Sequence, residues 1–76
     1  MNNTRRAELN MIRTKLENLM SKLTEIAEQE EEAFDNLPEG LQASTRGEAI
    51  EEAVDNLNSA IDALDEAIGY IDDATV

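Results

Sequence analysis

The chain has 76 residues, with eighteen acids against six bases for a net charge of −12, and it contains no Cys, His or Trp. A chain this short forms one domain at most, buries only about 60% of its unfolded surface, and has no thiolate or imidazole ligand for a disulfide or a transition metal. The charge argues against direct binding to nucleic acid or to an anionic membrane, because both require Lys and Arg.

The first half of the chain carries a long helical pattern. Apolar residues at alternating spacings of three and four are Leu9, Ile12, Leu16, Leu19, Leu23 and Ile26, and the spacing continues through Glu30, Ala33 and Leu37. This pattern lasts about four heptads and predicts a helix with one apolar seam. Asn3 or Thr4 can cap its start, and Pro38 ends it, so the predicted helix covers residues 4–36.

The second half repeats a heptad of the form x-x-Ala-(Val/Ile)-x-x-(Leu/Ile), which predicts a helix over residues 45–74. Its seam is Ile50, Val54, Leu57, Ile61, Leu64, Ile68 and Ile71. Beside the seam runs a column of small residues, Ala53, Ala60 and Ala67, which allows another helix to approach closely. Thr45 and Glu48 have the spacing of a capping box and are predicted to open this helix.

Residues 37–44 form a connector, and a link this short makes the two helices antiparallel neighbours. The predicted fold is therefore an all-α antiparallel helical hairpin, a single domain over residues 1–76. Met20, Ala27 and Phe34 lie one position beyond the first seam and favour a helix with two neighbours, so we expect a dimer that forms a four-helix bundle or coiled coil. The alternative is that they widen the core of a monomer. The residues expected in the core or oligomer seam are Leu16, Leu19, Leu23, Ile26, Val54, Leu57, Ile61, Leu64, Ile68 and Ile71.

Charge is segregated along the chain. Residues 1–22 hold five bases and two acids, a balance of +3, whereas residues 23–76 hold one base and sixteen acids, a balance of −15. In a hairpin, Arg5 and Arg6 are predicted to lie near Asp72 and Asp73. The acids expected to form a partner-binding surface at the turn end are Glu28, Glu31, Glu32, Asp35, Glu39, Glu48, Glu51, Glu52 and Asp55. They favour a basic partner, such as a protein that binds nucleic acid; the alternative is a solvated face that keeps the protein soluble.

The sequence lacks the patterns of catalytic chemistry. Its serines have no His partner, and no glycine-rich phosphate loop or EF-hand spacing occurs. We therefore expect no enzyme activity, no cofactor and no metal site. No apolar run approaches the length of a membrane span, and no secretory signal precedes the first helix.

Three features of the sequence are distinctive: the stretch Phe-Asp-Asn-Leu-Pro-Glu-Gly-Leu-Gln at residues 34–42, the Arg-Gly-Glu at 46–48, and the acidic Ala-Ile/Val heptads that follow. In these features the chain resembles uncharacterised small acidic helical-hairpin proteins of bacteria and their phages. Because the sequence shows no targeting or membrane signal, we expect a cytoplasmic protein, and the resemblance implies that the cytoplasm is that of a bacterial host. In size and charge the chain is also similar to phage inhibitors of host defence, such as anti-restriction DNA mimics and anti-CRISPR proteins. We expect a non-enzymatic inhibitor or decoy for a basic host protein. The alternatives are a structural hairpin that oligomerises, or an oligomeric sponge that holds a signalling nucleotide through Arg5, Arg6 and Arg13.

Overall fold

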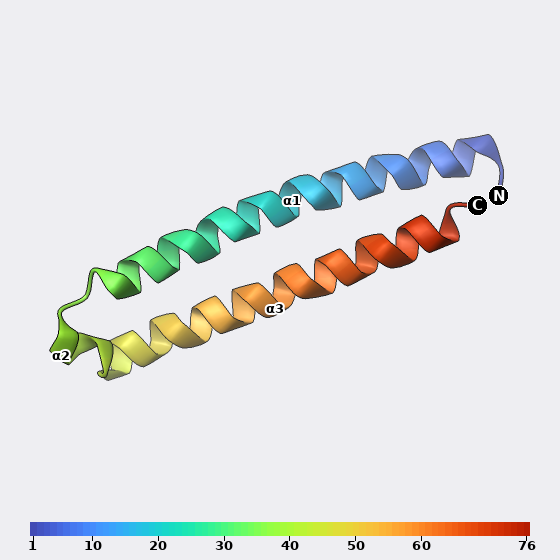
Figure 1. The fold of residues 1–76 in the computed structure, drawn as a ribbon. Helices are drawn as coiled ribbons and strands as arrows, with labels where there is room; N and C mark the ends of the chain where they lie inside the picture. The colour runs from blue at the N-terminus through green and yellow to red at the C-terminus, as the bar shows by residue number, and fades with distance from the viewer.

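The computed structural model covers residues 1–76 and contains three helices and no strand: α1 (Asn3–Asp35), α2 (Glu39–Gln42) and α3 (Thr45–Ala74). The two long helices lie side by side and antiparallel, with both termini at one end of the molecule and α2 at the other (Figure 1). The molecule is a rod with extents of 58 × 15 × 11 Å. The prediction of an all-helical chain folded as a hairpin is confirmed.

Both long helices start with a capping side chain one residue earlier than predicted. Oδ1 of Asn2 accepts a hydrogen bond from the backbone N–H of Arg5 at 2.8 Å, so Asn2 caps α1 in place of Asn3 or Thr4. Oγ of Ser44 accepts from the backbone N–H of Gly47 at 3.5 Å and caps α3. The predicted capping box at Thr45 is therefore wrong, because Thr45 is already the first helical residue.

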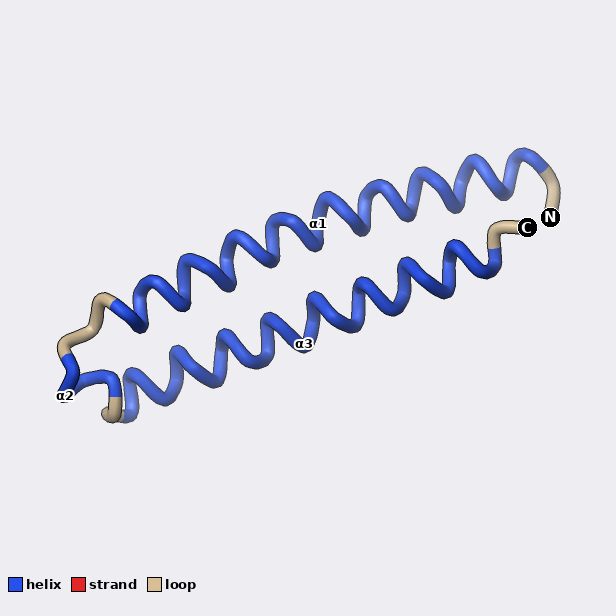
Figure 2. Tube along the Cα trace, viewed as in Figure 1, coloured by secondary structure: helices blue, strands red, loops and turns tan.

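The connector is more ordered than predicted, because it contains the short helix α2 between two tan loop segments (Figure 2). Nε2 of Gln42 donates to the carbonyl oxygens of Phe34 and Leu37, both at 3.3 Å, and so satisfies acceptors at the end of α1. Gly47 is buried where α2 folds back over the start of α3, and a Cβ there would lie 2.0 Å from the carbonyl oxygen of Gln42. Only glycine allows this approach.

The seam of α3 is the one the sequence predicts. Buried or half-buried residues of this helix include Ile50, Val54, Leu57, Ile61, Leu64, Ile68 and Ile71. The seam of α1 differs from its prediction at every second position, since its least exposed residues are Arg6, Leu9, Arg13, Leu16, Met20, Leu23, Ala27, Glu30 and Phe34. Four predicted members lie outside it: Ile12, Leu19 and Ile26 are 46%, 51% and 47% exposed, and Ala33 is exposed as well.

The difference arises because α1 has a central apolar column with a second apolar column on each side of it, so two different seams are possible. Leu9, Leu16 and Leu23 belong to both possible seams, but a helix with a single neighbour can turn only one of the flanking columns inward. The observed rotation is held near both ends of the rod. Arg13 pairs with Asp72 near the termini, and Phe34 lies beside Val54 in a groove near the connector.

The resulting core is thin. Its buried apolar residues are Ala27, Val54 and Ile68, and none is large and fully enclosed. The accessible surface is 5535 Å², against about 4,600 Å² for a compact monomer of this mass. The radius of gyration is 17.3 Å, against about 11 Å for a compact chain of this length. Two helices alone therefore leave much apolar surface in contact with water.

Candidate functional site

Two acidic grooves run along one side of the hairpin, where α1 and α3 meet. The larger has a volume of about 660 Å³ and occupies the middle and the terminal end of the rod. Its lining residues are Arg13, Glu17, Met20, Ser21, Thr24, Glu25, Glu28, Asp65, Ile68, Gly69 and Asp72. The smaller, of about 420 Å³, lies toward the connector and is lined by Glu31, Phe34, Asp35, Glu51, Val54 and Asp55.

The two grooves belong to a single side of the molecule, which we call the groove face and define by these lining residues. On α1 the polar lining residues Glu17, Ser21, Thr24, Glu28, Glu31 and Asp35 follow one another at spacings of three and four. Residues at such spacings lie on one face of a helix. Carboxylates from both helices therefore line the same side of the rod over most of its length.

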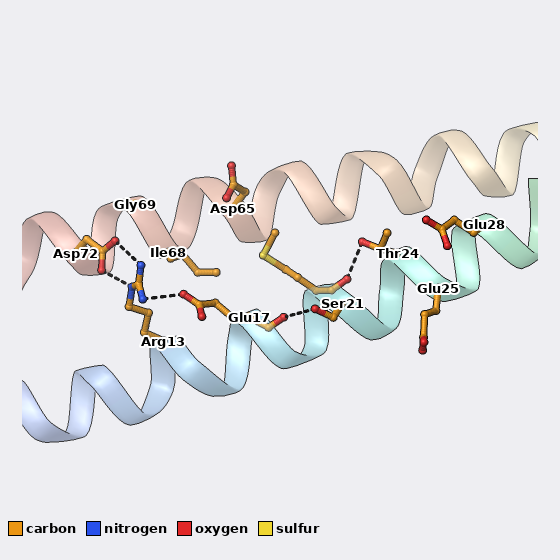
Figure 3. A pocket seen from close by; sticks show the side chains of 11 residues that line it. Arg13, Glu17, Ser21, Thr24, Glu25, Glu28, Asp65, Ile68, Gly69 and Asp72 are labelled. Carbon is orange, nitrogen blue, oxygen red and sulfur yellow. Dashed lines mark hydrogen bonds and ion pairs between the residues drawn. The ribbon is translucent and has the colours of Figure 1, made fainter.

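The larger groove is closed near the termini by the strongest charge contacts of the molecule (Figure 3). Arg13 Nε lies 2.5 Å from Asp72 Oδ1 on the opposite helix, and Arg13 Nη1 lies 2.7 Å from Glu17 Oε1 one turn along α1. The hydrogen bond with Asp72 is the largest cause that raises the pKa of Arg13 above its ordinary value, followed by the charges of Asp72 and Glu17. Arg13 is the only base that lines either groove.

The other predicted ion pairs at this end are not those observed. Arg5 and Arg6 were expected beside Asp72 and Asp73, but Arg13 takes Asp72 because its column turns inward. Arg6 instead donates from Nε to the carbonyl oxygen of Val76 at 2.7 Å and from Nη1 to Asn3 Oδ1 at 2.8 Å. Two of the three arginines proposed to hold a nucleotide phosphate are therefore engaged within the chain.

Hydroxyl groups of the larger groove are turned to the backbone of α1. Oγ of Ser21 donates to the carbonyl oxygen of Glu17 at 3.2 Å, and Oγ1 of Thr24 donates to that of Met20 at 2.9 Å (Figure 3). Both donors are thus used within the helix. The charged groups that remain for recognition are carboxylates, which bind cationic or hydrogen-bond-donating groups.

All nine acids predicted for partner binding are exposed. The smaller groove brings together four of them, Glu31, Asp35, Glu51 and Asp55, and the larger groove includes Glu28. The other four, Glu32, Glu39, Glu48 and Glu52, line neither groove. The predicted surface therefore divides into a groove part and an outer part.

Sequence reasoning missed the groove acids far from the connector, which are Glu17, Glu25, Asp65 and Asp72. Their position relative to the α3 seam could have identified two of them. Asp65 and Asp72 each follow a seam residue, Ile61 and Ile68, by four positions, as Glu51 follows Gly47. This recurrent spacing places carboxylates along one flank of the seam rather than only at one end.

Most of this negative charge is not neutralised within the molecule. The only ion pairs are those of Arg13 with Glu17 and Asp72, so sixteen of the eighteen acids have no basic partner. No group of three or more acids is arranged to hold a metal ion. None of the helices combines enough length and apolarity to span a membrane.

No protein-family model matches the chain, and neither the curated proteins nor the solved structures include one that is detectably similar to it.

Proposed function

We propose that this protein is a non-enzymatic acidic binding module that engages a basic surface of another protein, in the manner of a phage-encoded or mobile-element inhibitor or decoy. The observation that carries the proposal is the groove face, where nine carboxylates from two antiparallel helices border one side of a rod and only Arg13 opposes them. Crowded carboxylates repel one another in the free protein. A basic partner relieves this repulsion when it binds.

The shape of the groove face favours an extended partner site. Carboxylates follow the rod from Asp72 near the termini to Asp35 and Asp55 near the connector, within a molecule 58 Å long. Charge spread along a narrow rod resembles the phosphates of a duplex more than the compact charge of a small ligand. A protein groove that holds nucleic acid is therefore the partner class that suits it best, with association that is fast and sensitive to salt.

The proposal is tested with a variant in which the groove carboxylates become isosteric amides: Glu31→Gln, Asp35→Asn, Glu51→Gln and Asp55→Asn. The matched control removes the same charge from positions outside the grooves: Glu32→Gln, Glu52→Gln, Glu66→Gln and Asp73→Asn. Each immobilised protein is incubated with bacterial proteins that elute from heparin, which enriches those that bind nucleic acid. The bound proteins are then eluted with increasing salt.

We expect the unmodified protein and the control to retain the same heparin-binding protein, and to release it between about 0.1 and 0.5 M salt, over which screening becomes strong. We expect the groove variant to lose it. Equal retention by the groove variant and the control would show that total charge, not the groove face, is recognised. Retention that does not respond to salt would contradict a carboxylate-mediated contact altogether.

A structural role is the second candidate, and the exposed Ile12, Leu19 and Ile26 are the observation that favours it. In this candidate the hairpin associates with a second copy into a four-helix bundle, so that the thin core is completed. The two functions are compatible, because one uses carboxylates and the other uses apolar side chains. Their salt dependence has opposite sign: salt weakens binding to a basic partner but screens the repulsion between two copies of charge −12.

A further inference from the structure

The side of the hairpin opposite the groove face is apolar on both helices. On α1, Ile12, Leu19 and Ile26 directly precede the seam residues Arg13, Met20 and Ala27, and each is about half exposed. The groove residues Glu17 and Thr24 instead come four positions after the seam residues Arg13 and Met20. A residue one position before a seam residue is rotated from it by about 100° around the helix axis in one direction. A residue four positions after the seam residue is rotated by about 40° in the opposite direction. The exposed column and the groove therefore lie on opposite flanks of the seam.

The same relation holds on α3, where an alanine column takes the place of the large side chains. Ala53, Ala60 and Ala67 directly precede the seam residues Val54, Ile61 and Ile68. Because groove residues of both helices share one side, the residues that precede the seam share the other. We call this side the apolar face and define it as Ile12, Leu19, Ile26, Ala53, Ala60 and Ala67.

The apolar face is kept free of acids on α3. The next column outward from the alanines consists of Ala49, Asn56, Ala63 and Tyr70. All nine acids of α3 lie at other positions around the helix, toward the groove or the outer surface. An uncharged strip therefore borders the alanine column along its length. A surface that only needed to be soluble would not require this separation.

Each column is centred on its own helix, and the two helices are staggered along the rod. Leu19 is the central residue of α1 (Asn3–Asp35), with Ile12 and Ile26 seven residues to either side. Ala60 lies at the centre of α3 (Thr45–Ala74), with Ala53 and Ala67 seven residues to either side. Because Arg13 pairs with Asp72 and Phe34 lies beside Val54, Leu19 is level with α3 residues near Ala67 rather than with Ala60. A two-fold axis perpendicular to the rod at Leu19 therefore maps the α1 column onto itself and meets α3 near Ala67.

We propose that a second copy of this chain covers the apolar face, with the two hairpins antiparallel end to end, so that α1 packs on α1 and α3 on α3 of the second copy. Leu19 then meets its own counterpart, and Ile12 of one copy meets Ile26 of the other. On α3 the axis lies near Ala67, so Ala67 of one copy lies close to Ala67 of the other. This inference rests on the self-association part of the proposed function and assigns the surface that performs it.

The area available is what a stable dimer requires. The whole side of the rod that carries the apolar face is 58 Å long and 15 Å wide, a footprint of roughly 870 Å² on each copy or about 1,700 Å² in total, and the apolar face is its central part. Standard protein–protein interfaces bury about 1,200–2,000 Å². The two columns run over the central half of each helix, with Ala53 and Ala67 half-buried and the other members exposed, so apolar contacts form the centre of the interface and polar residues form its edge.

Charge selects the antiparallel arrangement over the alternative in which the connector ends lie together. The half of the hairpin that contains the termini, residues 1–19 and 67–76, has four bases and four acids, a balance of zero. The half that contains the connector, residues 20–66, has two bases and fourteen acids, a balance of −12. The antiparallel dimer places each strongly acidic half over the neutral half of the other copy. The alternative stacks the two strongly acidic halves and is disfavoured.

The arrangement has a consequence for binding. Each groove face points away from the dimer interface, so the dimer presents two acidic grooves on opposite outer sides. A basic partner with two sites, or itself a dimer, then gains affinity through simultaneous engagement.

Single-cysteine variants test the inference directly, because the chain has no cysteine of its own. Leu19→Cys places one thiol on the proposed axis, and mild oxidation is expected to convert most of the protein into a disulfide-linked dimer. Met11→Cys is the matched control, since Met11 is 58% exposed on the same helix but lies outside the apolar face. We expect little cross-linked product from the control. Equal cross-linking of both variants would overturn the proposed interface.

Orientation is tested by mixing Leu19→Cys with Ala67→Cys, because Ala67 lies nearly level with Leu19 on the other helix. Cross-linking of each variant with itself supports the antiparallel dimer, whereas a product formed only in the mixture would overturn it in favour of the arrangement with both connectors at one end. The unmodified protein is examined by sedimentation equilibrium in parallel. A monomer that persists at about 100 µM protein and 0.5 M salt would overturn the dimer itself.

Leu19→Glu is expected to weaken dimerisation at least about 100-fold, because two buried carboxylates would meet on the axis, whereas Met11→Glu leaves it unchanged. Circular dichroism checks that both variants keep their helices. The groove variant with four amides is expected to dimerise at least as tightly as the unmodified protein, since it loses repulsive charge. Loss of partner binding with an intact dimer, or the reverse, therefore separates failure of one proposal from failure of the other.

Discussion

Replacement of Gly47 or Gly69 by alanine should change the stability of the hairpin in opposite directions, although both glycines lie within α3. At Gly47, the new Cβ would lie 2.0 Å from the carbonyl oxygen of Gln42, 2.6 Å from its carbonyl carbon and 2.8 Å from the carbonyl oxygen of Leu41. At Gly69, nothing lies within 4 Å of the new Cβ. The two variants add the same methyl group to the same helix and differ only in what surrounds it.

The expected magnitudes follow from this difference. Alanine is favoured over glycine inside a helix by about 1 kcal/mol, so Gly69→Ala should stabilise the protein by that amount. In a domain of this size, 1 kcal/mol corresponds to about 4–8 °C in Tm. The clash at Gly47 is with backbone, which cannot rotate away, so α2 must move off the start of α3. Overpacking of this kind costs about 1–3 kcal/mol, and we expect Gly47→Ala to lower Tm by at least about 4 °C.

Thermal and urea unfolding followed by circular dichroism measure both changes. All samples are compared at one protein concentration, because the Tm of a protein that self-associates depends on concentration. The reasoning is refuted if Gly47→Ala is as stable as the unmodified protein. A destabilised Gly69→Ala would show that this groove position is more confined than its surroundings indicate.

Three further predictions concern caps and charge. Asn2→Ala and Ser44→Ala each remove a helix N-cap and should lower the free energy of unfolding by about 1 kcal/mol, measured by urea denaturation, with faster amide exchange in the first turn of the affected helix. Raising salt from about 0.02 to 0.5 M should raise Tm, because sixteen acids lack a basic partner; a falling Tm would show that attractive pairs dominate. Because the pKa of Arg13 is raised in the folded protein, Arg13 stabilises the fold fully at every pH below the ordinary arginine pKa. This stabilisation is lost only as the pH rises above that ordinary pKa. The difference in urea midpoint between Arg13→Gln and the unmodified protein should therefore stay constant from about pH 6 to pH 9.

The functional interpretation joins two surfaces on opposite sides of one thin rod. The groove face combines carboxylates from both helices, and the apolar face combines large side chains from α1 with alanines from α3. Neither surface is satisfied within a single hairpin. One lacks counter-charges, and the other lacks a packing partner, so both are suited to binding other molecules.

The sequence by itself determined the existence and length of the helices. Their predicted ranges, 4–36 and 45–74, differ from the observed Asn3–Asp35 and Thr45–Ala74 by a single residue at each end of the first helix. It also determined the seam of α3, because that helix has only one column of large apolar residues. Its flanking column holds alanines, which have too little surface to compete for the interface. The caps were placed one residue late, since neighbouring residues of α1 and α3, such as Thr4 and Thr45, are also good caps.

Only the tertiary structure decided which side of α1 faces its neighbour. Ile12, Leu19 and Ile26 form as regular a column as Arg13, Met20 and Ala27, and local spacing does not distinguish them. Contacts remote in sequence did, above all the pair between Arg13 and Asp72. That choice placed the carboxylates on one side and three large apolar residues on the other. The charge of −12 was evident from composition, but its arrangement into a groove depends on a rotation of α1 that contacts between the two helices determine.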